Sequence, residues 1–94
     1  MIVVANTTPL IGLASIQRFD ILNKILGEVI IAQAVFDEIM KARGRKKIAQ
    51  HEVSTSTWLH VTSVQDRLAV EVLLDELDLG EAETIVLARE INAG

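Results

Sequence analysis

Short apolar runs alternate with amphipathic stretches along the chain. Residues 2–5 and 28–32 are brief runs of mostly β-branched residues, which suits strands buried on both faces of a parallel sheet. Between them, residues 8–17 and 20–27 carry apolar side chains at helical spacing, the second stretch opening on Asp20 and ending on Gly27. A strand, a helical hairpin and a second strand make a βαβ crossover, which predicts a parallel pair with a right-handed connection.

The remaining chain continues this alternation. Residues 33–42 predict a third helix, and the polar stretch 44–57 that follows predicts an irregular segment with a short helix near 47–53. Residues 58–64 alternate apolar and polar positions, the pattern of a short edge strand. A helix from Asp66 to residue 77 and a last helix over 81–92 complete the pattern. For these two helices the predicted inward positions are Leu68, Val72, Leu73 and Leu77, and then Ile85, Val86, Ala88 and Ile91.

The chain length and the element order predict one α/β domain, residues 1–94, with a short parallel sheet. In this pattern a helix that packs on the sheet is normally followed by another strand. We therefore expect the domain to be incomplete at its C-terminus. We also expect the apolar strand 2–5 to have an open edge.

Composition narrows the possible classes of protein. The chain contains no cysteine, which excludes a disulfide scaffold and a thiolate metal site and is compatible with a reducing cytoplasm. Its apolar runs are too short to span a bilayer. The formal net charge of −4 argues against binding nucleic acid by overall charge alone.

The basic residues are unevenly distributed. Five of the nine fall within seven positions, namely Lys41, Arg43, Arg45, Lys46 and Lys47. Such a cluster can bind phosphates, although more often it is only a solvated loop after a helix.

The first candidate site is the polar turn after strand 2–5. Asn6, Thr7 and Thr8 precede Pro9, and a polar cap followed by Pro is a helix-start signal. The turn lies at the carboxyl end of a strand, where open α/β sheets bind their ligands. The same residues would also serve simply as helix caps and turn-stabilising side chains.

Four carboxylates form the second candidate site: Asp37 and Glu38 in the third helix, and Glu81 and Glu83 near the start of the last. Oxygen ligands suit Mg²⁺ or Mn²⁺, which can promote phosphodiester hydrolysis. Periodicity does not choose between Asp37 and Glu38. Glu81 and Glu83 also suit the positive end of a helix dipole, and Glu83 occupies the position of a capping-box partner after Gly80.

Four segments together resemble the PIN-domain family: IVVANTTPLIGLASI, EVIIAQAVFDEIMKA, WLHVTSV and LDLGEAETIVLARE. The likeness extends over the whole chain and includes an LxxGExE motif before the last helix. It implies a three-layer, Rossmann-like α/β/α fold. It also implies a Mg²⁺- or Mn²⁺-dependent endoribonuclease, many relatives being toxins of toxin–antitoxin pairs.

The resemblance assigns roles to particular residues. The first acidic position of the family falls on Asn6, the second on Glu38, and the third on Glu81 with Glu83 as a substitute. Glu38 and Glu81 are then catalytic metal ligands, Asn6 and Glu83 further ligands, and Thr8 an orienting hydroxyl. Lys41, Arg43, Arg45, Lys46 and Lys47 would guide RNA.

Two departures from the family leave two hypotheses. Asn6 replaces a carboxylate, and the family continues into a further strand that ends near a fourth acidic residue. The first hypothesis is an active cytoplasmic ribonuclease, with an antitoxin-type protein as a partner. The second is a truncated, catalytically silent relative that acts as a homo-oligomer or partner-binding module.

Overall fold

A three-stranded parallel sheet lies at the centre of the fold. The computed structural model describes residues 2–92, apart from the side chains of residues 45 and 46. Strands β1 (Val3–Val4), β2 (Val29–Ala32) and β3 (Leu59–Thr62) follow the order β1-β2-β3, and both neighbouring pairs are parallel. The predicted parallel pair is therefore confirmed, and β1 lies at one edge of the three strands. The pairing of β1 continues to Ala5, the residue before the polar turn, because the Ala5 amide donates to the Ile30 carbonyl at 3.0 Å.

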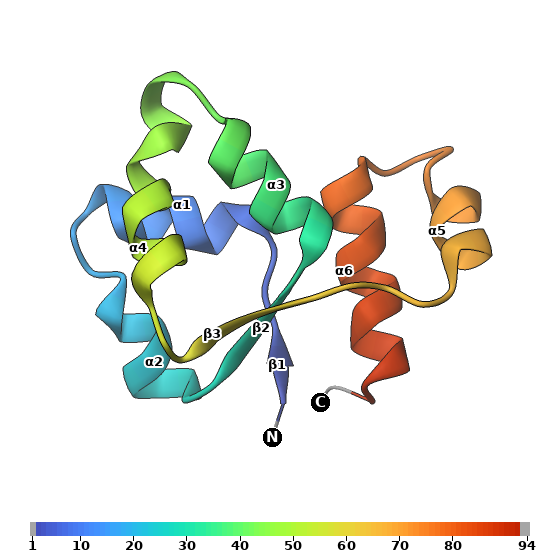
Figure 1. The fold of residues 1–94 in the computed structure, drawn as a ribbon, viewed down its shortest axis with the longest axis horizontal. Helices are drawn as coiled ribbons and strands as arrows, with labels where there is room; N and C mark the ends of the chain where they lie inside the picture. Colours follow the sequence, from blue (N-terminus) through green and yellow to red (C-terminus); the bar gives the residue numbers. More distant parts are fainter. Residues whose placement is uncertain (1, 93–94) are drawn as a thin grey trace.

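Helices cover the sheet on two sides. In chain order they are α1 (Thr7–Ser15), α2 (Asp20–Leu26), α3 (Gln33–Lys41), the 3₁₀ helix η1 (Gly44–Ala49), α4 (Gln50–Thr55), α5 (Arg67–Leu73) and α6 (Leu79–Glu90). Figure 1 shows α1, α2 and α4 gathered on one side of the strands and α5 and α6 on the other. Helix α2 contacts β2, whereas α6 contacts both β1 and β2. The predicted α/β/α architecture is confirmed.

The core is apolar and centres on β2. Val29, Ile31 and Ala32 of this strand are completely buried, as expected for the middle strand of a parallel sheet with helices on both faces. Leu10, Val35 and Leu87 contribute buried side chains from three different helices. Among the residues that the structure describes, no helix is both long and apolar enough to cross a membrane.

The predicted inner faces of α5 and α6 are partly wrong. Leu68 and Val72 are 70% and 66% exposed, and Ile85 is 52% exposed, whereas Val70 and Val86 are buried. Helix α5 has only seven residues. Its apolar residues can form either of two neighbouring stripes, and within each stripe successive residues lie about four positions apart. Packing against α6 selects the stripe through Val70, a choice that the periodic pattern cannot make.

Candidate functional site

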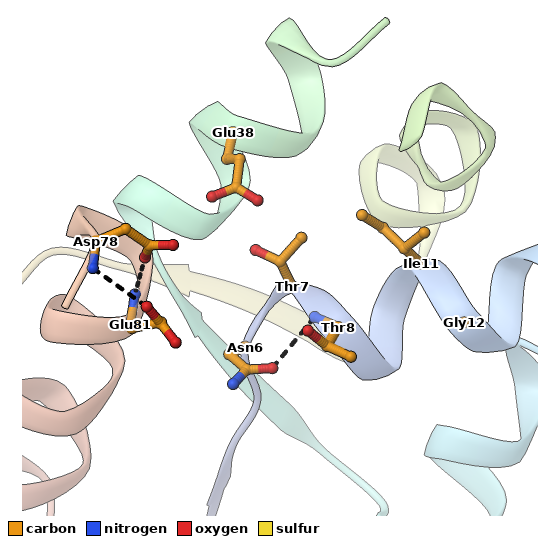
Figure 2. A pocket seen from close by; sticks show the side chains of 8 residues that line it. All are labelled: Asn6, Thr7, Thr8, Ile11, Gly12, Glu38, Asp78 and Glu81. Carbon is orange, nitrogen blue, oxygen red and sulfur yellow. Dashed lines mark hydrogen bonds between the residues drawn. The ribbon is translucent and has the colours of Figure 1, made fainter. Parts of the chain in front are cut away.

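A cleft of about 440 Å³ opens where β1, α3 and α6 meet. Figure 2 shows the eight residues that line it, which come from the turn after β1, from α1, from α3 and from the start of α6. They are Asn6, Thr7, Thr8, Ile11, Gly12, Glu38, Asp78 and Glu81. The cleft thus contains five of the residues singled out from the sequence, namely Asn6, Thr7, Thr8, Glu38 and Glu81.

The polar turn after β1 places Asn6 at the start of α1. Asn6 is the N-cap of this helix, and its side-chain oxygen accepts a hydrogen bond from the Thr8 amide at 3.2 Å. Helix α1 begins at Thr7, so Pro9 occupies the third helical position instead of the first. That position also lacks an intrahelical acceptor, so Pro causes no loss there. Asn6 therefore serves both as a helix cap and as part of the cleft wall.

Helix α3 directs Glu38 into the cleft. Figure 2 shows the Glu38 carboxylate extending from α3 toward the space between the α6 N-terminus and Thr7. The neighbouring Asp37 is not among the lining residues, and its carboxylate accepts a hydrogen bond from Gln33 Nε2 at 2.9 Å. The choice between these two acidic residues, open from periodicity alone, is made by the way α3 packs.

The start of α6 contributes two carboxylates that cap the helix. Asp78 Oδ1 accepts from the Glu81 amide at 2.8 Å, and Glu81 Oε1 accepts from the Asp78 amide at 3.1 Å, which forms a capping box. The prediction that Glu83 would be the capping-box partner is therefore wrong. Asp is a stronger N-cap than Gly, so α6 begins at Leu79, and its third residue is Glu81.

Asp78 is a cleft residue that the sequence reasoning missed. The predicted helices 66–77 and 81–92 leave residues 78–80 between them, and this division separates Asp78 from Glu81 and so conceals the pattern Asp-x-x-Glu. That pattern is the sequence signature of a capping box. It could have placed both carboxylates on one helix terminus, although it gives no indication that the terminus faces α3.

Gly80 allows α6 to approach Glu38 closely. Gly80 is buried, and a Cβ atom built at this position would lie 3.4 Å from Glu38 Oε1 and 3.6 Å from Asp78 Oδ1. Carboxylate oxygens from two different helices therefore contact the same small volume. These are ordinary van der Waals distances, so a methyl group at this position would touch both carboxylates without forcing the two helices apart.

This arrangement can be compared with known proteins. A family model described as a PIN domain matches residues 2–94. The chain belongs to the PIN domain family. No curated protein and no solved structure matches it.

The three carboxylates that line the cleft of this PIN domain have no salt-bridge partner among the residues that the structure describes. Within the described part of the chain, none of the ion pairs involves Glu38, Asp78 or Glu81. Carboxylates that share a site repel each other unless a cation or a proton compensates them. The N-terminal dipole of α6 supplies partial compensation for Asp78 and Glu81. The cleft is thus suited to a positively charged ligand.

The chemistry of this donor set fits a hard divalent cation such as Mg²⁺ or Mn²⁺. Carboxylate and amide oxygens are the protein ligands that these ions prefer. Glu38 accepts no hydrogen bond from a described side chain or amide, and Asp78 and Glu81 each use only one carboxylate oxygen in the capping box. As they stand, however, no three acidic or histidine side chains of the described residues are gathered closely enough to hold one ion.

Glu83 is not brought into the cleft. Its side chain is buried, with 4% of the residue exposed. One carboxylate oxygen accepts from the Ala34 amide at 2.9 Å, and the other accepts from Arg67 Nη1 at 2.7 Å. Because both oxygens are bonded inside the protein, we do not retain the expectation that Glu83 is a metal ligand of this PIN domain.

The basic segment lies beside the cleft. Lys41, Arg43 and Lys47 are exposed, whereas the side chains of Arg45 and Lys46 lie outside the described residues. Lys47 lines a hollow that shares Ile11 with the cleft, and Lys41 lines another that shares Glu38 and Asp78 with it. Cationic side chains therefore flank the acidic cleft of the PIN domain on two sides.

Proposed function

We propose that this PIN domain is a divalent-metal-dependent nuclease that cleaves RNA phosphodiester bonds in the cytoplasm. One observation carries the proposal. Glu38, Asp78 and Glu81, which come from α3 and the start of α6, line one cleft together with Asn6. Acidic residues separated by some forty positions in the chain have no folding requirement to share a cleft in which no described side chain forms an ion pair with them.

The residues of the cleft divide into two roles. Glu38 and Glu81 would hold the ion, with Asp78 and the side-chain oxygen of Asn6 as further oxygen donors. When bound, the ion would polarise a phosphoryl oxygen and lower the pKa of a coordinated water. Thr8 lies on the exposed rim of α1, where its hydroxyl would orient the substrate or a ligand.

The basic segment would supply the affinity for RNA. The chain carries a formal net charge of −4, so its overall field repels a polyanion. Lys41 and Lys47 flank the cleft, and Lys41, Arg43, Arg45, Lys46 and Lys47 would bind phosphates along the RNA backbone. Membership of the PIN family also supports regulation by an antitoxin-type protein partner.

The test is a cleavage assay with single-stranded RNA and Mn²⁺. Glu38→Gln and Glu81→Gln each remove one charge from the cleft, and Gln at residue 81 can still complete the capping box. We expect either change to lower the cleavage rate by about 100-fold or more, the usual cost of losing one group that stabilises developing charge. Chelation of the metal should abolish cleavage.

Glu71→Gln is the matched control, because Glu71 is an exposed carboxylate on α5 outside the cleft. It removes the same charge and should leave the rate unchanged. Cleavage that survives both Glu38→Gln and Glu81→Gln would exclude the proposed site.

A second candidate is a catalytically silent PIN domain that pairs with another copy of itself. Strand β1 lies at the edge of the sheet, and Ile2 beside it is 46% exposed. An unpaired apolar edge strand favours association with another strand. Sedimentation velocity should then show a dimer that dissociates on dilution, and a monomer at all concentrations would exclude this function.

A further inference from the structure

Glu83 joins three helices through one buried carboxylate. It is the only buried charged or polar residue in the described part of the chain. From α6 it accepts a hydrogen bond from the amide of Ala34, in the first turn of α3, and another from Arg67, the first residue of α5. Burying a charge is costly unless it is paired and hydrogen-bonded, and both requirements are met here.

The same two helices make a second contact at the cleft. Ala34 and Glu38 are four residues apart on α3, and Gly80 and Glu83 are three residues apart on α6, so each pair lies on one helix face. Glu83 contacts Ala34, and Gly80 lies against the Glu38 carboxylate. Two points of contact, about one helical turn apart, therefore define how α3 lies against α6.

We propose that Glu83 is a positioning residue, which sets the placement of Glu38 relative to Asp78 and Glu81 through its bond to α3. The inference rests on the proposed function, because that placement serves the binding of a metal. Glu83 acts from within the protein and contacts neither the ion nor the RNA. In the GExE segment of the sequence, the first glutamate is then a ligand, and the second fixes the geometry of the ligands.

A merely stabilising contact would behave differently. Its loss would lower the free energy of unfolding but would leave the metal affinity of the folded protein unchanged. A positioning contact changes the Mn²⁺ affinity of the folded protein. It also shifts the amide resonances of Glu38 and Gly80 at temperatures where the protein is fully folded.

Two substitutions of Glu83 separate the effect of side-chain length from the effect of side-chain charge. Glu83→Gln keeps the length of the side chain and an oxygen that can accept from the Ala34 amide, but it loses the charge that pairs with Arg67. Glu83→Asp keeps the charge but is one methylene shorter, which withdraws the carboxylate from Ala34. Arg67 is about half exposed, so its side chain can turn to solvent in the Gln variant.

The experiment measures Mn²⁺ affinity by titration calorimetry and amide resonances by NMR without metal. Glu83→Asp should weaken Mn²⁺ binding by about 10- to 100-fold, as is typical when a group supporting metal ligands is lost. It should also shift the Glu38 and Gly80 amides. Glu83→Gln should retain wild-type values in both measurements, and Glu71→Gln serves as the matched charge control.

Wild-type affinity and unmoved amides in Glu83→Asp would overturn the inference. Equal losses in Glu83→Gln and Glu83→Asp would overturn it as well, because the charge would then matter as much as the length of the side chain. If the wild-type protein itself binds no Mn²⁺, the proposed function fails. The amide resonances then still decide whether Glu83 positions Glu38.

Discussion

Two glutamates two residues apart on α6 lie in opposite surroundings. Glu81 is exposed at the cleft and bonds only to the amide that it caps, whereas Glu83 is 4% exposed and bonds to two other helices. A helix turns by about 200° over two residues, so neighbouring glutamates of one motif face different sides. The comparison teaches that residue type and spacing do not reveal which carboxylate is available for chemistry. The hydrogen-bond and ion-pair partners of each carboxylate in the folded protein reveal which one is available.

The two surroundings differ most in their cationic partners. Arg67 Nη1 lies 2.7 Å from Glu83 Oε2. By contrast, none of the ion pairs among the described residues includes a carboxylate of the cleft. A buried carboxylate that is paired and hydrogen-bonded connects the elements around it in the folded structure. Accessible carboxylates that share a site without a cationic partner repel one another, and a bound cation relieves this repulsion.

Removing the buried carboxylate should lower the free energy of unfolding, whereas removing a cleft carboxylate should leave it nearly unchanged. Glu83→Leu leaves the buried Ala34 amide without its acceptor, so we expect it to lower the free energy of unfolding by about 1–3 kcal/mol. Glu38→Gln removes repulsion and should leave stability within about 0.5 kcal/mol of the wild type. Urea unfolding measures the free energy of unfolding of both variants. A Glu83→Leu variant as stable as the wild type would contradict the structural role of the buried carboxylate.

Adding a carboxylate to the cleft should strengthen its metal binding. Asn6→Asp preserves a good N-cap for α1 and adds one negative charge beside the candidate ligands. We expect Mn²⁺ affinity to rise by roughly tenfold, or about 1.4 kcal/mol. Asn92→Asp, the same change on an exposed residue after the far end of α6, is the control. Equal effects of the two substitutions would mean that Asn6 is not part of a cation site.

Adding a methyl group at Gly80 should change the Mn²⁺ affinity more than the stability of the fold. The added methyl group would make ordinary contacts at 3.4–3.6 Å with Glu38, Asp78 and Val35. Gly80→Ala should therefore be as stable as the wild type or gain up to about 1 kcal/mol from helix propensity. Because the methyl group restricts the Glu38 carboxylate, Mn²⁺ affinity should fall by less than about tenfold.

Gly12→Ala provides the comparison for Gly80→Ala. Gly12 also lines the cleft, from α1, but it takes no part in the α3–α6 contact. Beyond its chain neighbours and the α1 backbone, an added Cβ there meets no described atom within 4 Å, so it would touch none of the candidate ligands. The same gain in helix propensity should appear without a loss of metal affinity. A loss of equal size in both variants would contradict the role of the α3–α6 contact.

The smallest effect should come from an exposed acid far from both glutamates. The ammonium group of Lys24 donates to Asp20 and, together with Arg18, holds the pKa of the Asp20 carboxyl below its ordinary value of 3.8. A lowered pKa means that this contribution to stability is present above the ordinary pKa and is lost as the pH falls through the lowered one. Asp20→Asn should therefore unfold marginally earlier near pH 7, and the difference should vanish in acid. Thermal unfolding at several pH values checks this, and a difference that grows in acid would contradict it.

The sequence predicted those parts of the site that depend on local pattern. Apolar runs identified β1 and β2, and the polar turn after a strand placed Asn6 and Thr8 at the sheet edge where ligands bind. The PIN resemblance then selected Glu38 and Glu81. All four residues line the cleft of the structure.

Features that depend on contacts between distant segments were missed. The burial of Glu83 requires Ala34, 49 residues away in the chain, and Arg67 on another helix. Asp78 enters the cleft because α6 begins two residues earlier than predicted and because its first turn packs against α3 at Gly80. Likewise, the packing of α5 on α6 decides that Leu68 and Val72 face outward. None of these contacts leaves a periodic signal in the sequence.

The central claim is that the cleft carboxylates together form a cation site, and calorimetric titration with Mn²⁺ tests it most directly. We predict one saturable site in the wild-type protein. Its affinity should fall by at least about tenfold, or 1.4 kcal/mol, in Glu38→Gln and in Glu81→Gln, and should be unchanged in Glu71→Gln. Equal Mn²⁺ binding by all four proteins, or no binding by any of them, would contradict the claim.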